Sequence, residues 1–113
     1  MIKIYHNPRC SKSRQTLEIL QEAGQQPEVI EYLKTPPTAS ELRELLQKLN
    51  LKPEQLLRKG EQLYKDKYKN QQLSGEELIA IMAENPVLIE RPIVVKDNKA
   101  VLGRPPENVL ELL

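Results

Sequence analysis

The only cysteine of this 113-residue chain, Cys10, is the residue best suited to covalent chemistry. It follows Asn7-Pro8, a pair that favours a turn, and it precedes a run whose apolar residues recur at helical spacing. The start of a helix has unpaired backbone N–H groups and the positive end of the helix dipole, and both favour an anion. A lone cysteine is more often an inert buried thiol, but this setting predicts a reactive thiolate.

A negatively charged substrate would need cations beside that thiolate, because two unit charges about 4 Å apart repel by about 4 kcal/mol at an effective dielectric constant of about 20. Arginine suits this role, since its planar guanidinium binds an oxyanion through two donors and stays charged at any working pH. Arg91 and Arg104 each precede a proline beside a predicted strand, and Arg58 follows a short predicted helix, where it could project into a cleft. A single arginine is more often a solvated surface residue, but two Arg-Pro pairs favour an anion site.

Four polar residues near Cys10 have two open interpretations each. His6 could influence the ionisation of the thiol or could cap the end of a strand. Asn7, Ser11 and Ser13 could donate hydrogen bonds to an anion or could shape the turn and the helix start. Ser13 also makes the motif C-x-x-S rather than C-x-x-C, so a redox cycle must finish on a partner thiol.

The elements on either side of Cys10 predict a strand-helix-strand unit. Residues 2–5 are typical of a short strand, and residues 28–32 contain two adjacent β-branched residues and predict a second one. Between them, the apolar spacing predicts a helix that has Ser11 as its N-cap and ends at Gly24. Such a crossover implies that the two strands are parallel.

The middle of the chain, about residues 38–85, is expected to be helical. Leucines at helical spacing predict one helix started by Thr38 or Ser40, and a capping box at Ser74 and Glu77 predicts another. No repeat or low-complexity linker separates this segment from the rest, so it is expected to be an integral part of one domain.

The last third of the chain predicts a hairpin and a closing helix. Residues 93–96 and 99–102 are β-rich and are joined by Asp97-Asn98, two residues that tolerate positive φ. Prolines then open a short helix whose apolar residues are Val109, Leu110 and Leu113.

The order β-α-β, helices, β-β-α resembles the thioredoxin-like layout, an α/β fold built on a mixed sheet. We expect a single domain over residues 1–113, with a helical insertion at about residues 38–85. The resemblance to that fold implies that Pro92 is the cis-proline that faces the active thiol.

Composition excludes several classes of protein. The net charge of +1 gives no bulk attraction to nucleic acids or membranes, and the absence of Trp and Phe disfavours stacking on bases. The lysines and tyrosines of residues 59–69 fit a solvated helical face better than a nucleic-acid patch. No apolar run approaches the length of a membrane span and the N-terminal residues do not have the basic-then-apolar pattern of a leader, so a soluble cytoplasmic protein is expected.

Three motifs resemble those of the glutaredoxin-coupled arsenate reductases and their less defined relatives: HNPRCSKSR at residues 6–14, NPVLIERPIVV at 85–95 and GRPPENVLELL at 103–113. The resemblance implies that Cys10 attacks arsenate and that Arg58, Arg91 and Arg104 hold the oxyanion and its reduced product. It also implies glutathione as co-substrate, glutaredoxin as the protein that reduces the mixed disulfide, and no bound metal or organic cofactor.

Two alternative functions stay open at this point. The first is a regulator of the same fold that resembles the Spx regulators, which bind RNA polymerase and typically sense redox state through C-x-x-C, a motif that Ser13 precludes here. The second is a glutathione-dependent thiol reductase that does not act on arsenate.

Overall fold

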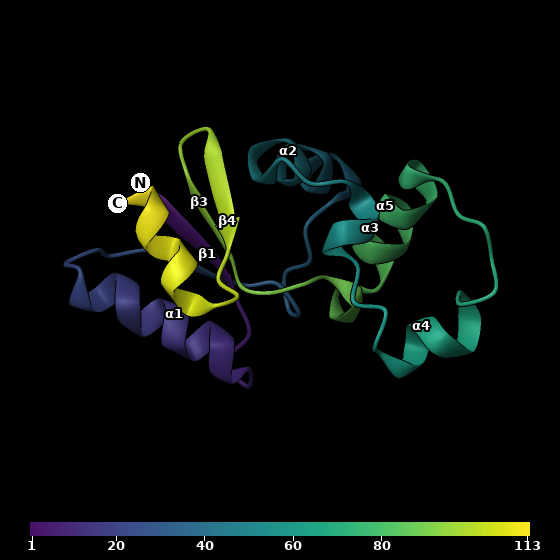
Figure 1. The fold of residues 1–113 in the computed structure, drawn as a ribbon, viewed down its shortest axis with the longest axis horizontal. Helices are drawn as coiled ribbons and strands as arrows, with labels where there is room; N and C mark the ends of the chain where they lie inside the picture. Colours follow the sequence, from purple (N-terminus) through teal and green to yellow (C-terminus); the bar gives the residue numbers. More distant parts are fainter. The chain divides into compact units, whose positions relative to one another are not determined.

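The computed structural model describes all residues 1–113 and contains a four-stranded mixed sheet in the order β2-β1-β3-β4. Strand β1 (Ile2–His6) pairs in parallel with β2 (Glu28–Glu31) and antiparallel with β3 (Ile93–Lys96). Strand β4 (Lys99–Leu102) completes the hairpin with β3, and Asp97 has the positive φ of 56° that the turn requires (Figure 1). The α/β class, the mixed sheet and the parallel first pair are therefore confirmed.

Helix α1 (Ser11–Glu22) packs on this sheet through Ser13, Thr16 and Leu20, which are buried at spacings of three and four residues. It ends as predicted at Gly24, whose φ is 81°. The N–H of Gly24 donates to the carbonyl of Gln21 and that of Gln25 to the carbonyl of Leu20, which is a Schellman motif.

The helix start differs by one residue from the prediction. Cys10 itself is the N-cap, with φ −97° and ψ 123°, and Ser11 is the first helical residue. The N–H of Cys10 donates to the carbonyl of Asn7, and its carbonyl accepts from the N–H of Arg14. The turn that precedes the helix therefore ends on Cys10, which leaves Ser11 exposed on the first turn.

The chain closes with a 3-10 helix, η2 (Pro106–Leu112), which packs against α1 and β4 (Figure 1). Of the three apolar residues that indicated this helix, Val109 is buried, whereas Leu110 and Leu113 are 51% and 45% exposed. A 3-10 helix has about three residues per turn, so its inward face repeats every third residue. That face consists of Pro106, Val109 and Leu112.

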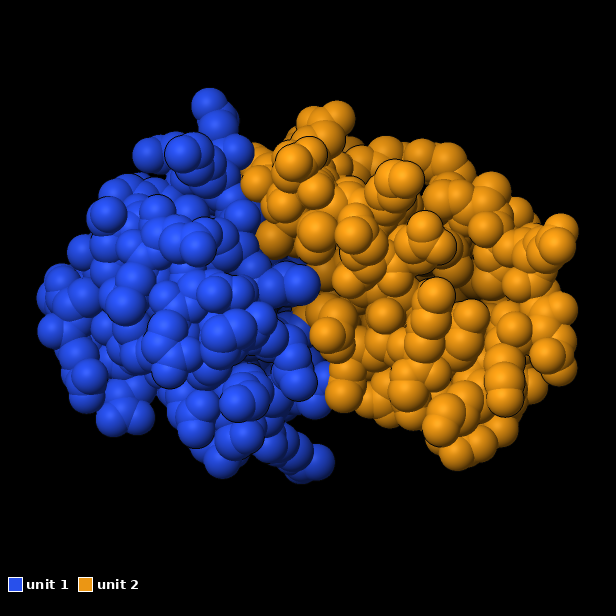
Figure 2. All heavy atoms as spheres, viewed as in Figure 1, with its two compact units in different colours: residues 1–35, 91–113 blue, residues 36–90 orange.

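Contacts divide the molecule into two compact units, residues 1–35 with 91–113, and residues 36–90 (Figure 2). The core of the first unit contains Ile2, Ile4, Leu20, Val94, Val109 and Leu112. The helical segment expected at residues 38–85 lies within the second unit.

The second unit contains four α-helices and a 3-10 turn. Helix α5 begins at the predicted capping box of Ser74 with Glu77. Helix α2 begins at a capping box of Thr38 with Glu41, and Thr38 was one of the two predicted starting residues. Helix α5 packs against α2 and α3. Their bounds are α2 (Ala39–Leu49), α3 (Pro53–Leu56), α4 (Gln62–Lys67), α5 (Gly75–Glu84) and η1 (Pro86–Leu88).

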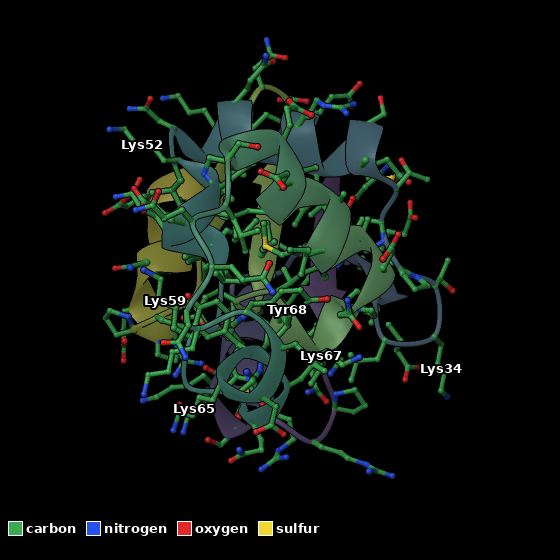
Figure 3. The ribbon with its side chains drawn as sticks, turned by 90° about the vertical axis from the view of Figure 1, so that its right-hand side faces the viewer. Lys34, Lys52, Lys59, Lys65, Lys67 and Tyr68 are labelled. Carbon is green, nitrogen blue, oxygen red and sulfur yellow. The ribbon has the colours of Figure 1, made fainter.

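Helix α4 is the solvated helix that the sequence predicted. None of its residues is buried, and Figure 3 labels Lys65 and Lys67 on it. No helix in the molecule combines the length and the apolar character needed to cross a membrane.

Gly103 lies so close to Thr16 and Pro92 that an added side chain should destabilise the protein. A Cβ there would lie 2.4 Å from Thr16 Oγ1 and 2.8 Å from Pro92 Cγ, whereas a Cβ at Gly60 would meet nothing within 4 Å. We expect Gly103→Ala to lower the free energy of unfolding by about 1–3 kcal/mol, and Gly60→Ala to change it by less than about 0.5 kcal/mol. Urea unfolding of both variants measures this, and equal effects would contradict the packing that we describe.

Candidate active site around Cys10

Cys10 lies between the end of β1 and the first turn of α1. Its side chain is 9% exposed and makes no capping hydrogen bond. The first turn of α1 contains no acidic residue, so no carboxylate competes for the positive end of this 12-residue helix. An anion at the position of the sulfur is therefore favoured by the backbone around it.

The loop that holds Cys10 is fixed by the buried hydroxyl of Ser13. Ser13 Oγ lies 2.6 Å from His6 Nδ1 and accepts the backbone N–H of Asn7 at 3.0 Å. The side chain of Asn7 accepts the N–H of Arg9, also at 3.0 Å. These contacts give Asn7 and Ser13 the loop-shaping role that was one of their two interpretations.

His6 is buried and contacts the same hydroxyl. Burial lowers the pKa of its imidazole below 6.5, the carboxylate of Glu31 opposes that shift, and the cation of Arg14 adds to it. His6 is therefore neutral at pH 7. With Nδ1 bonded to Ser13, its ring orientation is fixed at the end of β1.

Both Arg-Pro peptides are cis, at Arg91-Pro92 and at Arg104-Pro105. The first was expected from the fold, and the second was not foreseen. Strand register places both at the same edge of the sheet, because Ile93 pairs with Tyr5 on one side and with Leu102 on the other. Arg91 and Arg104 thus flank the edge at which the loop to Cys10 begins.

The two arginines have different surroundings. Nε and Nη1 of Arg91 are buried and have no hydrogen-bond partner in the protein. Arg104 is exposed, and its Nη1 donates to the backbone carbonyl of Arg91 at 3.3 Å. Buried cationic donors without acceptors are costly, so the guanidinium of Arg91 is suited to receive an anion.

Arg58 lies in the second unit, where two carboxylates bind it. Its Nε lies 3.1 Å from Glu90 Oε1, and its Nη1 contacts Glu61 Oε1. Its backbone N–H donates to the carbonyl of Leu88. The ion pair with Glu90 could not be predicted from the sequence. Glu61, three residues after Arg58, could have been predicted as a partner from this spacing.

A cavity of about 390 Å³ opens beside the Cys10 loop. The sequence did not indicate it, although parallel strands such as β1 and β2 bring their carboxyl ends to one edge, where ligands commonly bind. No group of three or more His, Cys, Asp or Glu side chains is placed to hold a metal ion. The cavity is lined by His6, Asn7, Pro8, Arg9, Glu31, Leu33 and Lys34.

The strand order and the position of the single cysteine at the start of the first helix are those of a thioredoxin-like protein. Within that class, the chain belongs to the ArsC family, whose sequence profile matches residues 5–112.

The relatives match this chain over nearly its full length and nearly all of their own. The uncharacterised Escherichia coli protein YfgD is 54% identical over 99% of this chain and 96% of its own, and a Neisseria meningitidis arsenate reductase is 46% identical over 99% and 97%. The structure of an arsenate reductase from Vibrio cholerae is 52% identical, covers 99% of this chain and 97% of its own, and superposes with a TM-score of 0.95.

The environment of His6 predicts a pH-dependent stability. Because its pKa is lower in the folded protein than the ordinary 6.5, neutral His6 contributes stability that is complete above about pH 6.5 and is lost as the pH falls through the folded value. We expect the free energy of unfolding of the parent, relative to His6→Asn, to be smaller at pH 5.5 than at pH 7.5. Urea unfolding at the two pH values tests this, and a pH-independent difference would show that His6 does not titrate in this range.

Proposed function

We propose that this protein reduces arsenate to arsenite in the cytoplasm through a covalent adduct on Cys10, with glutathione and glutaredoxin returning the enzyme to its thiol form. The observation that carries the proposal is that Nε and Nη1 of Arg91 are buried and have no acceptor, at the edge from which the Cys10 loop starts. The arsenate reductases among the relatives support arsenate as the anion.

Such a site must offset the repulsion between two negatively charged reactants. A thiolate and an arsenate oxyanion repel by several kcal/mol at contact distance. In the proposal, Arg91 and Arg104 bind the arsenate oxygens and offset this repulsion, and the N-terminus of α1 stabilises the thiolate. Arg58 is the third arginine of the family motif, and it is ion-paired with Glu61 and Glu90.

The proposed reaction then proceeds in three steps. The thiolate of Cys10 attacks arsenic, an S–As bond forms at arsenic(V), and the As–O bond to a hydroxyl group breaks, so that the hydroxyl takes up a proton from solvent and leaves as water. Glutathione thiolate attacks the Cys10 sulfur, so that an S–S bond forms and the S–As bond breaks with its electron pair going to arsenic, which leaves as arsenite. Glutaredoxin then takes the glutathionyl group and restores the Cys10 thiol.

The external thiol is required because the chain offers no second cysteine. The position three residues after Cys10 is Ser13, whose hydroxyl is bound to His6 and to the Asn7 backbone. The two electrons must therefore come from a partner, and the proposal needs no bound metal or organic cofactor.

Replacement of the nucleophile tests the covalent step. We expect Cys10→Ser to abolish arsenate reduction and to leave the unfolding midpoint close to that of the parent, since serine is nearly isosteric. The assay is glutathione- and glutaredoxin-coupled NADPH oxidation with arsenate. Residual turnover in the folded variant would exclude Cys10 as the nucleophile.

Arginine-to-lysine changes test anion geometry at constant charge. Because lysine lacks the planar pair of donors, we expect Arg91→Lys and Arg104→Lys each to reduce arsenate turnover by about tenfold or more, while iodoacetamide, which is neutral, still alkylates Cys10 at the parent rate. Arg43→Lys, at an exposed ion pair with Glu76, is the matched control and should retain full turnover.

The same assays separate the alternatives. Full turnover in both site variants would overturn the role of these arginines. A parent protein that reacts with glutathione disulfide but never reduces arsenate would be a thiol reductase of another specificity, and one that does neither would fit a binding protein of the same fold.

A further inference from the structure

We propose that the cavity beside the Cys10 loop binds glutathione through the two charged ends of the tripeptide. This inference rests on the proposed use of glutathione and goes further by assigning a site to it. The cavity volume, about 390 Å³, falls in the range of roughly 300–1,000 Å³ typical of small-molecule sites.

The charges around the cavity complement those of glutathione. Its walls contain two exposed cations, Arg9 and Lys34, and one half-buried carboxylate, Glu31. Glutathione has the inverse set, two carboxylates and one ammonium. Leu33 supplies an apolar wall for the aliphatic part of such a ligand.

Glu31 and Lys34 fit the γ-glutamyl end. Lys34 Nζ lies 3.5 Å from Glu31 Oε1 at the end of β2, and the Lys34 side chain reaches out at the right-hand edge of Figure 3. An α-amino carboxylate presents an ammonium and a carboxylate on one carbon atom, so it can pair with both members of such a couple. The existing pair is exposed and worth little, so exchanging it for the ligand costs little.

Arg9 fits the glycine carboxylate and directs the thiol toward Cys10. Arg9 precedes Cys10 in the chain, and the N–H of Cys10 donates to the carbonyl of Asn7, which lines the same cavity. Cys10 itself does not line the cavity, so the proposed site holds the two ends of the tripeptide, and its central cysteine is assigned to the side of the loop that leads to Cys10.

Thiol-disulfide exchange without arsenate tests the site separately from the reaction. Cys10 thiolate attacks glutathione disulfide, so that a Cys10–glutathione S–S bond forms, the original S–S bond breaks and one glutathione thiolate leaves. Mass spectrometry follows the mixed disulfide over time. Bis(2-hydroxyethyl) disulfide, a neutral reagent, is treated in the same way, and the ratio of the two rates isolates recognition of the charged ends.

We expect this ratio to fall by about two- to fivefold in each of Arg9→Gln, Lys34→Gln and Glu31→Gln. Lys99→Gln is the matched control, because it removes the same charge at the hairpin turn, at the other end of β4 from Arg104. Its ratio should equal that of the parent.

The Glu31→Gln variant distinguishes a specific site from general electrostatic attraction. General attraction of an anionic reagent to positive charge predicts a higher ratio when a carboxylate is removed, whereas a site that pairs Glu31 with the ammonium predicts a lower one. A higher ratio, or ratios that match the parent in all three variants, would overturn the assignment. If the ratios fall as expected in a protein that does not reduce arsenate, the glutathione site stands and the proposed function fails.

Discussion

The central position of β1 is the constraint on which the site depends. This five-residue strand is bonded on both sides, in parallel by β2 and antiparallel by β3, so the two ends of the chain must meet in one sheet. The carboxyl end of β1 then lies beside the start of β3, and β4 returns to the same edge. One short strand thus brings together the cysteine loop, both Arg-Pro peptides and the rim of the cavity, all of which come from distant parts of the sequence.

The three arginines of the family motif have different surroundings. Arg91 is half-buried, with Nε and Nη1 buried and unpaired, Arg104 is exposed and bonded to the backbone of Arg91, and Arg58 in the second unit is paired with two carboxylates. Their positions in the sequence motifs do not distinguish these states. An arginine whose buried donors are unpaired gains most from an anion, since the desolvation of those donors has already occurred.

The features that could be predicted from the sequence are those set by local chemistry. Ser74 with Glu77, Gly24 at the end of α1 and Asp97 in the hairpin each act over a few residues, and each was found as expected. The inward face of η2 could not be predicted, because apolar spacing does not reveal whether a short helix has 3.0 or 3.6 residues per turn. The carboxylate of Glu90, the second cis peptide and the cavity depend on contacts between distant segments, which periodicity does not contain. Cys10 could be selected from its setting, whereas Arg58, Arg91 and Arg104 were selected together only through the family resemblance.

The bonding of Ser13 limits how this scaffold can change. Its hydroxyl is placed to accept the Asn7 N–H at 3.0 Å while it pairs with His6 Nδ1 at 2.6 Å. A thiol is a larger group and a weaker hydrogen-bonding partner, so it would not reproduce either contact at the same length. Ser13→Cys would therefore create a dithiol motif and loosen the loop at the same time. A second thiol at this position would therefore require compensating changes at His6 or Asn7.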